Sequence, residues 1–382
     1  MPSAPPITIL HVFSTFAVGG PQVRFAKIAA HLGDEFHHAI LAMDGDYACR
    51  SRLDPRVHVS YPEITFRKGH TAANALRFRR CLRELRPDVM VTNNWGSIEW
   101  SVANAVPLTR HIHIEDGFGP EERDAQIQRR VWMRRVFLRH STVVVPSLTL
   151  RRIATETWKL PAARVKHIPN GIDCAQFDGG SRMVEPPGNG VVIGTVAALR
   201  PEKNISRLLH AFSRVATRRA ARLVIVGDGP DLAELRRLAG ELGLMAQVEF
   251  VGHAERPEEY YGGFDIFALS SDTEQMPLAI IEAMAAGLPI AATDVGDTRA
   301  MVADVNRALV TGCDADALAN SLQQLVADRE KRDRLGAANR KKARRLYDQE
   351  EMFGAYSWLF RASEAERATD AWNGRQGTPR HA

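Results

Sequence analysis

The chain has 382 residues, which is long for one hydrophobic core and enough for two domains of ordinary size. Hydrophobic residues make up 45% and charged residues 25%, as in a globular protein, and no apolar run approaches the ~20 residues needed to span a bilayer. The four cysteines show neither metal-ligand spacing nor a paired framework, so we expect a reduced, cytoplasmic protein. No basic residue precedes Arg24, so the first residues lack the charged start of a signal peptide.

The net charge of +5 is small but unevenly distributed. Residues 66–86 hold seven Arg or Lys and one Glu, and residues 329–345 hold nine Arg or Lys and two acids. Nothing in the chain matches a recognised nucleic-acid-binding motif, so we expect no nucleic-acid partner. An anionic membrane surface or a phosphorylated acceptor explains the basic segments at least as well.

Short apolar runs alternate with helical patterns along the whole chain. In the first half we expect strands at residues 7–13, 38–42, 88–93, 110–115, 142–146 and 165–168. In the second half we expect strands at residues 191–197, 222–227, 247–252, 264–269, 288–293 and 306–310. Their near-continuous apolar character indicates strands buried on both faces of parallel sheets, and the alternation with helices indicates βαβ units.

A segment rich in Gly and Pro, residues 178–190, separates the two halves and predicts a linker. We therefore expect one Rossmann-like domain at residues 1–177 and another at residues 191–350, with a ligand near the carboxyl ends of their strands. Beyond them we expect a helix at residues 351–368 and a disordered tail at residues 369–382.

Two features of the first half lie where strands are expected to end. Gly19 and Gly20 follow the first strand and expose backbone that a phosphate or a sugar can approach, although an ordinary strand-to-helix loop has the same composition. His113, Glu115 and Asp116 lie at the end of a later strand. His113 shares one side of that strand with Glu115, and a core histidine is its simpler interpretation.

Residues 76–86 predict an amphipathic helix. Four apolar residues fall on one face at helical spacing: Phe78, Cys81, Leu82 and Leu85. This face either packs in the core or belongs to a membrane-docking surface, together with a second basic helix at residues 129–139 that carries Trp132. We keep both interpretations.

In the second half, cations and glycines gather where strands end. Arg200 and Lys203 lie at a strand-to-helix junction, where cations oppose the helix dipole unless an anion is bound. A diphosphate is such an anion, because Arg binds it bidentately and Lys adds a compact charge. Gly227 and Gly229 form a Gly-x-Gly turn, but Leu232 replaces the Gly that a dinucleotide fingerprint requires.

Glu274 and Glu282 stand eight positions apart, the first in an expected loop and the second inside an expected helix. The first turn of that helix, Met276, Pro277 and Leu278, has backbone N–H groups free to bind an anion, and Pro277 has no N–H to lose there. Two carboxylates beside a phosphate suit a nucleotide-sugar, because each can accept hydrogen bonds from sugar hydroxyls. At this spacing alone, an ordinary amphipathic helix is the simpler interpretation.

The motifs Arg-x-x-Lys, Gly-Asp-Gly-Pro and Glu-x7-Glu, in this order and at strand ends, resemble the signature of glycosyltransferase family 4 (glycosyl transferases group 1), the retaining GT-B transferases. The resemblance implies a GT-B fold, with two facing Rossmann-like domains and a nucleotide-sugar cleft between them. It implies that Glu274 binds the donor sugar and Glu282 the nucleotide ribose. Arg200 and Lys203 would stabilise the leaving diphosphate, and the turn at Gly229 would line the base pocket.

The resemblance also assigns residues of the first domain, which should bind the acceptor. The loop at Gly19 and Gly20 would lie beside the donor. The catalytic His that the family often has at a strand end is replaced here by Asp116, which would orient the acceptor hydroxyl or stabilise positive charge on the sugar. Glu115 and His113 remain alternatives for this role.

The function implied is transfer of a sugar from a nucleotide-diphosphate-sugar to a saccharide or lipid-linked acceptor, with retention of configuration, in cell-envelope or exopolysaccharide synthesis. No cofactor or metal is expected, and the two Asp-x-Asp strings, residues 44–46 and 314–316, read as turns or helix caps. We expect a cytoplasmic enzyme that binds peripherally to the inner face of the membrane. A nucleotide-sugar epimerase of the same fold and a non-catalytic membrane-associated binding protein remain alternatives.

Overall fold

The computed structural model describes residues 6–67, 69–122, 125–177, 190–216 and 221–361. The chain divides into two compact units, unit 1 with Met1–Ile168 and Phe353–Ala382, and unit 2 with Pro169–Met352. Residues 178–189 of the expected linker and the expected tail lie outside the described residues. The domain limits proposed from the sequence stay a prediction.

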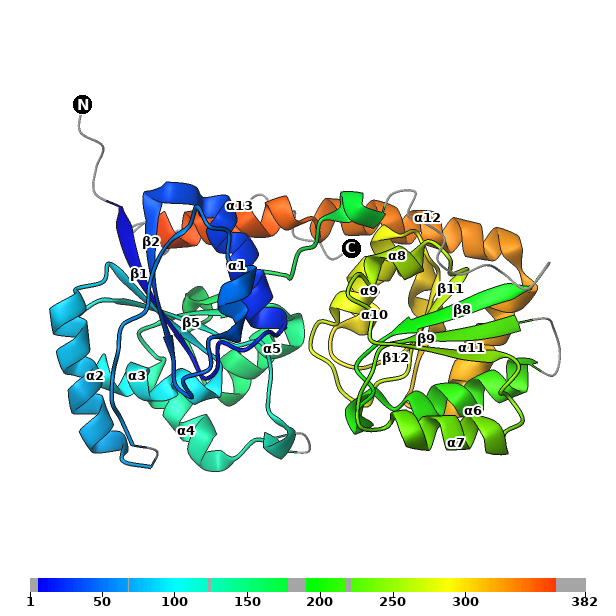
Figure 1. Cartoon of the computed structure of the whole chain (residues 1–382), viewed down its shortest axis with the longest axis horizontal. Helices are drawn as coiled ribbons and strands as arrows, with labels where there is room; N and C mark the ends of the chain where they lie inside the picture. The colour runs from blue at the N-terminus through cyan, green and yellow to red at the C-terminus, as the bar shows by residue number, and fades with distance from the viewer. Residues whose placement is uncertain (1–5, 68, 123–124, 178–189, 217–220, 362–382) are drawn as a thin grey trace. The chain divides into compact units, whose positions relative to one another are not determined.

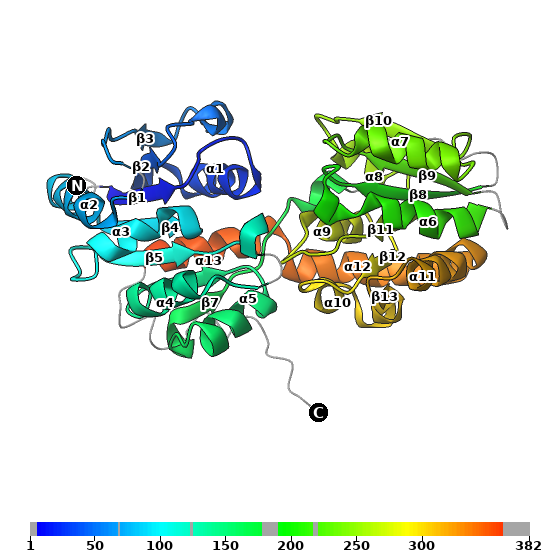
Figure 2. The ribbon, with the colours of Figure 1, turned by 90° about the horizontal axis from the view of Figure 1, so that it is seen from below.

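Unit 1 contains a seven-stranded parallel sheet with the order β3-β2-β1-β4-β5-β6-β7, most of which can be followed in Figure 2. The strands are β1 (Ile7–Phe13), β2 (Phe36–Ala42), β3 (His58–Ser60), β4 (Val89–Asn93), β5 (Arg110–Ile114), β6 (Thr142–Val145) and β7 (Val165–His167). The helices are α1 (Gly20–Leu32), α2 (Thr71–Leu85), α3 (Ile98–Ala103), α4 (Gln128–Phe137), α5 (Leu148–Arg152) and α13 (Gln349–Arg361). The chain reverses its direction of strand addition between β1 and β4, which is where doubly wound sheets bind ligands.

The apolar face of α2 lies in the core of unit 1. Phe78 and Leu82 are buried, and the ring of Phe78 stacks on Trp100 of α3 with centroids 4.4 Å apart. This burial removes the apolar face of α2 from any membrane-docking surface. The last helix, α13, adds the buried Leu359 and Phe360 to the same unit.

Unit 2 contains a six-stranded parallel sheet with the order β10-β9-β8-β11-β12-β13 (Figure 2). The strands are β8 (Val191–Val196), β9 (Ala221–Val226), β10 (Val248–Gly252), β11 (Ile266–Leu269), β12 (Ile290–Thr293) and β13 (Val310–Thr311). The helices are α6 (Ile205–Ala216), α7 (Leu232–Glu241), α8 (Glu258–Tyr261), α9 (Leu278–Ala285), α10 (Thr298–Met301), α11 (Ala315–Ala327) and α12 (Arg329–Leu346). Figure 1 shows α6 and α7 on one face of this sheet and α9 on the other.

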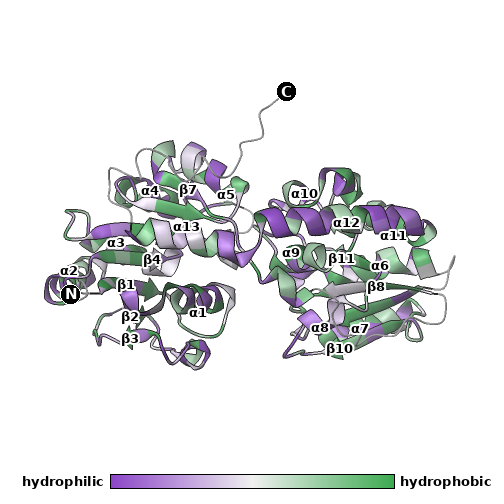
Figure 3. Cartoon of the chain, turned by 90° about the horizontal axis from the view of Figure 1, so that it is seen from above, coloured by the Kyte–Doolittle hydropathy of each residue, from purple (hydrophilic) through white to green (hydrophobic). Residues whose placement is uncertain are grey.

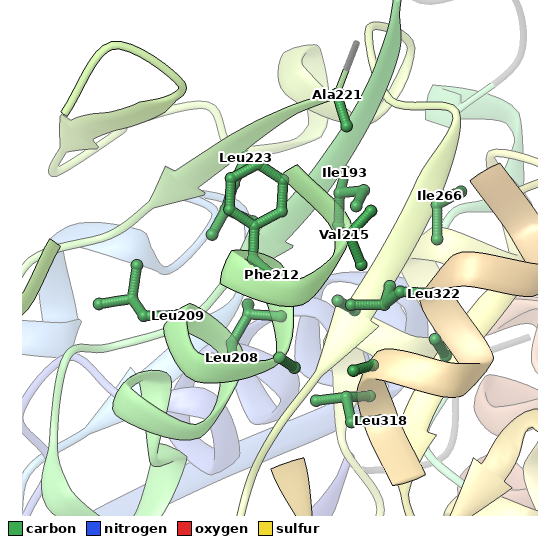
Figure 4. Close-up of a cluster of buried hydrophobic side chains, with 14 of the residues drawn as sticks. Ile193, Leu208, Leu209, Phe212, Val215, Ala221, Leu223, Ile266, Leu318 and Leu322 are labelled. Carbon is green, nitrogen blue, oxygen red and sulfur yellow. The ribbon is translucent and has the colours of Figure 1, made fainter. Parts of the chain in front are cut away.

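Buried side chains from strands and helices form the core of unit 2. On one face, Phe212 of α6 packs with Leu223 of β9, Ile193 of β8 and Leu322 of α11 (Figure 4). The apolar residues of α6 recur at helical spacing, so one face of this helix is covered by the sheet. The strands are buried on both faces, as the continuous apolar runs predict.

Eleven of the twelve expected strands are present with small shifts at their ends, and the twelfth is wrong in most of its length. Residues 306–310 were expected as a strand, but Asp304–Leu309 form a 3-10 helix and β13 covers Val310–Thr311. Asn306 explains the difference, because its buried side chain bonds both the N–H and the carbonyl of Ile290 and so replaces strand pairing there. The short β3 was not expected.

The basic run at residues 329–345 forms α12, which Figure 3 shows as largely hydrophilic. Several of its cations bind carbonyl oxygens at helix ends. Arg332 donates to Leu325 at the end of α11, and Arg340 donates to Ala285 and Ala286 at the end of α9. Part of the local positive charge is therefore used in the fold. Within the described ranges, none of the helices has the length and hydrophobicity required to cross a bilayer.

Candidate functional site

In unit 2, two of the expected site residues meet at the carboxyl edge of the sheet. The Nζ of Lys203 lies 2.6 Å from Oε1 of Glu274, and the Ser271 hydroxyl donates to the same oxygen at 2.8 Å. The two charged side chains are partly accessible, at 26% for Lys203 and 11% for Glu274. A cation and a carboxylate are thus held side by side where solvent can still reach them.

The loops that carry this pair are tied to each other. They follow β8 and β11, which are neighbours in the sheet. The N–H of Asp272 donates to the Glu202 carbonyl, and the side chains of Asn204 and Arg207 bind the Asp272 carboxylate. These contacts fix the separation between the Arg-x-x-Lys motif and Glu274.

Glu282 lies inside α9, and a residue that the sequence analysis did not single out holds its carboxylate. The hydroxyl of Tyr261 donates to Oε2 of Glu282 at 2.6 Å. Burial, and then the charge of Glu282, raise the pKa of Tyr261 well above its ordinary value, so the phenol stays protonated and donates. The ring of Tyr261 is fixed among Phe177, Phe264 and Phe267.

Three other expected residues lie on neighbouring strand ends. Arg200 is exposed, at the start of a 3-10 turn (Pro201–Lys203). Gly227 has a φ of 138°, and a Cβ there would overlap with the carbonyl oxygen of Ala197. A Cβ at Gly229 would overlap with the carbonyl of Leu199, so both glycines are required by close backbone packing.

The residues expected to bind an anion through their backbone precede α9. Met276 and Pro277 are buried, and the sulfur of Met276 accepts from the N–H of Asn170 at 3.3 Å. Leu278 begins the helix and is 37% exposed. Gln275 stands where the family commonly has Gly, and it is not among the non-glycine residues with positive φ. This loop therefore forms without the conformational freedom of glycine.

In unit 1, Asp116 is paired with a partner that the sequence analysis did not consider. Both oxygens of its carboxylate accept from Arg24, at 2.7 and 3.0 Å. Burial alone would lower the pKa of Arg24, but the charge of Asp116 raises this pKa above its ordinary value. Asn94 accepts from the N–H of Asp116 and fixes the backbone. The charge of Asp116 is thus compensated within the unit.

The two alternatives to Asp116 are inaccessible. His113 and Glu115 are both 0% exposed, so an acceptor cannot reach them without rearrangement. His113 is the core histidine that the strand pattern indicates, and its Nδ1 lies 2.8 Å from the hydroxyl of Thr92. Glu115 binds the buried guanidinium of Arg134 at 3.1 Å.

Arg134 is the centre of a buried charged cluster. It also contacts Glu122 at 3.3 Å, and its guanidinium lies about 5 Å from the ring centroids of Trp95, Phe118 and Trp158. Burial opposes ionisation of Glu122, but the hydrogen bond and charge of Arg134 lower its pKa below the ordinary value. The cluster fixes the loop that follows β5 and carries Asp116.

The remaining expected residues are Gly19 and Gly20. Gly19 caps α1 and its carbonyl accepts from Val23, while a side chain at Gly20 would meet open space. The loop therefore leaves room above the first turn of α1. The Asp-x-Asp strings are confirmed as turns or caps, since Asp44 accepts from the Asp46 N–H, and Asp314 caps α11.

Three residues of these sites had no motif to reveal them. Arg24 and Tyr261 are far in sequence from the expected residues that they bind, and Ser271, three residues before Glu274, is of a type common in any loop. Arg24 lies 92 positions from Asp116. An alignment showing paired changes at such positions would be the signal for contacts of this kind.

Two family models match the chain. Residues 18–176 match Glycosyltransferase Family 4, and residues 182–342 match Glycosyl transferases group 1. The chain belongs to this family of GT-B glycosyltransferases. The family that the motifs resemble is thereby confirmed.

Curated relatives carry related names. The chain is 31% identical over 197 residues to a GDP-mannose-dependent alpha-(1-6)-phosphatidylinositol monomannoside mannosyltransferase of Mycolicibacterium smegmatis, covering 47% of this chain and 52% of that protein. It is 27% identical to a D-inositol 3-phosphate glycosyltransferase of Nocardia farcinica, covering 65% of this chain and 61% of that protein. The chain thus matches about half of the length of the first of these relatives.

Solved structures share the fold. The Anabaena protein HepE, solved with UDP and glucose, superposes with a TM-score of 0.75 at 19% identity over 92% of this chain and 99% of that one. A sucrose-phosphate synthase from Thermosynechococcus elongatus gives 0.74 at 18% identity, over 93% and 98%. These likenesses confirm two Rossmann-like domains of the GT-B class.

Proposed function

We propose that the protein transfers a sugar from a nucleotide-diphosphate-sugar to a saccharide or lipid-linked acceptor with retention of configuration. The observation that carries the proposal is the Lys203–Glu274–Ser271 group at the carboxyl edge of the sheet in unit 2. The names of the two relatives, a GDP-mannose-dependent mannosyltransferase and an inositol phosphate glycosyltransferase, support this class of reaction. They favour transfer over epimerisation of the donor.

In this proposal, Arg200 and Lys203 bind the diphosphate of the donor. Negative charge on the diphosphate grows as the glycosidic bond breaks, so preplaced cations stabilise the transition state more than the bound donor. Lys203 is held by Glu274 before the donor arrives, and its side chain is therefore already positioned. The N–H groups at the start of α9 add a partial positive charge.

The two carboxylates bind hydroxyl groups of the donor. Glu274 accepts from the donor sugar, since Lys203 and Ser271 occupy one of its oxygens and orient the other. Glu282 accepts from the ribose and is oriented by Tyr261. We also propose that catalysis by these groups requires no cofactor and no metal.

A panel of nucleotide-sugars tests the proposed reaction. The chain is incubated with UDP-, GDP-, ADP- and dTDP-sugars together with a panel of saccharide and lipid-linked acceptors, and thermal stabilisation, nucleotide release and products are measured, with and without EDTA. We expect one donor to raise the Tm by mass action and to yield a glycoside with the anomeric configuration of the donor. An epimerised donor, or stabilisation without any product, contradicts the proposal.

Asp116 has a proposed role on the acceptor side, where its pairing with Arg24 replaces the His of the family. Asp116→Asn keeps the shape and leaves Arg24 uncompensated, so transfer should fall strongly while donor affinity stays nearly unchanged. Arg24→Gln with Asp116→Asn restores neutrality and serves as the matched control. Full activity in the double variant would assign the pair to structure alone.

We further infer that the enzyme works in the cytoplasm and docks on the inner face of the membrane through α4. Trp132 and Val136 of this helix are exposed at 56% and 41%, and Arg129, Arg135 and Arg139 are exposed beside them. An aromatic residue among arginines suits an anionic lipid surface, where each basic residue contributes roughly 1 kcal/mol. All four cysteines are free, as in a reducing compartment.

Vesicle cosedimentation tests the membrane proposal. Binding to vesicles with anionic lipid should exceed binding to zwitterionic vesicles and should weaken at high salt. Trp132→Ala should lower binding, whereas Leu76→Ala, at a still more exposed apolar residue on α2, should not. Equal, negligible binding to both lipids would remove the membrane from the proposed function.

A further inference from the structure

Unit 1 contains a pocket of about 540 Å³ at the carboxyl edge of its sheet, a size typical of small-molecule sites. Its wall includes Ser14 after β1, Met43 after β2 and Trp95 after β4. α4 contributes Arg129 and Met133. Asp44, of the Asp-x-Asp string at residues 44–46, lines it as well, and Arg129 belongs to the basic helix considered for membrane docking.

The pocket combines an apolar wall with a fixed carboxylate. Glu99 of α3 accepts from the hydroxyl of Thr71 at 2.6 Å through one oxygen and from the amide of Asn74 at 3.1 Å through the other. Asn74 is 1% exposed and also bonds the backbone of Arg67, so its amide cannot turn away. Each oxygen of Glu99 keeps a second acceptor position for a ligand hydroxyl.

The pocket also has one cation, Arg129, and a second carboxylate, the exposed Asp44. The guanidinium of Arg129 makes no ion pair or hydrogen bond with another described residue, Asp44 included. Its neighbours on α4 differ, because Arg130 binds Glu121 and Glu122, and Arg134 is buried with its own acids. An anionic group of a ligand would be the natural partner of Arg129.

We propose that this pocket binds the accepting group as a phosphorylated sugar or cyclitol ring. Ring hydroxyls donate to Glu99, the C–H face of the ring packs against Met43 and Met133, and the phosphate binds Arg129. The inference rests on the proposed glycosyl transfer and names the acceptor class for it. A phosphorylated ring can be free or attached to a lipid, and the chemistry at these residues is the same for both.

A purely apolar or a neutral acceptor fits the pocket less well. An apolar group would remove water from the Glu99 carboxylate and offer no hydrogen-bond donor to its free acceptor positions. Burying a charge in this way costs free energy. A neutral sugar would satisfy Glu99 and the apolar wall but would leave Arg129 without a partner. The phosphorylated ring uses the apolar, anionic and cationic parts of the wall together.

Calorimetric binding to the full chain tests the inference without requiring transfer. The probes are glucose 1-phosphate, N-acetylglucosamine 1-phosphate and myo-inositol 1-phosphate, with glucose and inorganic phosphate for comparison. We expect at least one phosphorylated ring to bind ten-fold more tightly than glucose and than inorganic phosphate. Arg129→Gln and Glu99→Gln should each weaken this binding at least five-fold, and Arg83→Gln, an exposed arginine of α2, should leave it unchanged.

Each outcome has one meaning. Equal effects of Arg129→Gln and Arg83→Gln, or no phosphorylated ring bound across the panel, overturn the inference. Thermal melts show whether the Glu99→Gln chain is folded. If it is not, Arg129→Gln, a change on the surface, still tests the inference. A decyl phosphodiester of the bound ring that binds more tightly than the free phosphate identifies a lipid-linked source. Loss of nucleotide-sugar binding with retained ring binding would contradict the proposed function alone.

Discussion

The carboxyl edges of the two sheets hold their charges in different ways. In unit 2, Lys203 and Glu274 remain partly accessible and Arg200 is exposed. In unit 1, Asp116 is about as accessible as Glu274, at 13%, but Arg24 pairs with both of its oxygens, and the neighbouring Glu115 is fully buried with Arg134. Partly accessible charges at either edge can meet a ligand, whereas a fully buried ion pair keeps a loop in place.

This difference separates two kinds of recognition. The accessible charges of unit 2 lie in short sequence motifs, and the diphosphate proposed as their ligand requires cations and a helix start close together. The pocket of unit 1 is assembled from five separate segments, in which Glu99 and Arg129 stand alone in sequence. An acceptor that varies from one enzyme to another leaves no common motif.

The largest expected effect concerns the buried cluster of unit 1. Arg134→Met would leave Glu115 buried without a guanidinium and Glu122 with that of Arg130 alone, which should lower the free energy of unfolding by about 3–5 kcal/mol. Urea denaturation measures the change. Arg135→Met on the exposed side of α4 is the control and should stay within about 0.5 kcal/mol of the parent.

Adding Glu115→Gln and Glu122→Gln to Arg134→Met sharpens this test. The triple variant has no uncompensated charge, so a large part of the lost stability should return. If the triple variant is as unstable as Arg134→Met alone, the cluster acts through packing of the arginine against its aromatic neighbours rather than through charge.

The next effect is on turnover and concerns the accessible cations of unit 2. Arg200→Ala and Lys203→Ala should each raise the barrier to transfer by ~2–4 kcal/mol, because leaving-group charge peaks in the transition state. Steady-state kinetics should show the loss mainly in kcat. Arg237→Ala, which removes an exposed arginine of α7, is the control. Unchanged rates in a folded Arg200→Ala/Lys203→Ala variant would exclude the diphosphate role.

Much of the fold follows from the sequence because it depends on local patterns. Continuous apolar runs of four to seven residues predict buried parallel strands, and eleven of the twelve were in place. The failure at residues 306–310 has a non-local cause, since the Asn306 side chain bonds a strand 16 residues away. An apolar run cannot reveal which polar side chain replaces its backbone pairing.

The contacts in the candidate sites also divide into those that follow from sequence motifs and those that depend on tertiary packing. Lys203 and Glu274 meet as their motifs imply, although their catalytic and binding roles stay a prediction. The role predicted for Asp116 also stays a prediction, and its partner Arg24 was not predicted, because it lies 92 residues earlier and no spacing rule connects them. The interpretation of residues 76–86 depended on whether one helix face is covered, which only tertiary packing decides.

A smaller effect concerns acid stability, because the buried histidines belong to unit 1. Burial and then His37 lower the pKa of His38 to about 4, burial and then His113 lower that of His111 to about 3, and burial lowers that of His11. These groups take up protons near pH 6.5 when unfolded. Their stabilisation is complete above pH 6.5 and is lost as the pH falls toward about 4, by roughly 3 kcal/mol for one histidine with the pKa of His38.

Hydrogen exchange resolved by peptide measures this acid sensitivity. Between pH 7 and pH 5, after correction for intrinsic rates, β1 and β2 should lose protection while β8 and β9 keep theirs, since no histidine occurs in the strands of unit 2. The His11→Phe/His38→Leu variant should flatten the pH dependence of unit 1. Equal loss in both units would assign acid sensitivity to carboxylates instead.

The smallest expected effect concerns the position of the Glu282 carboxylate in unit 2. Tyr261→Phe removes the hydrogen bond to Glu282 and leaves the ring in place, so Glu282 can turn away from the ribose. A hydrogen bond to a charged group is worth about 1.5–3 kcal/mol, and only part of this should appear as weaker donor binding. We expect KM for the donor to rise a few-fold with kcat nearly unchanged. Tyr260→Phe, on the adjacent residue, is the control. A fall in kcat at constant KM would instead connect Tyr261 to the chemical step, and would show that Glu282 does more than bind.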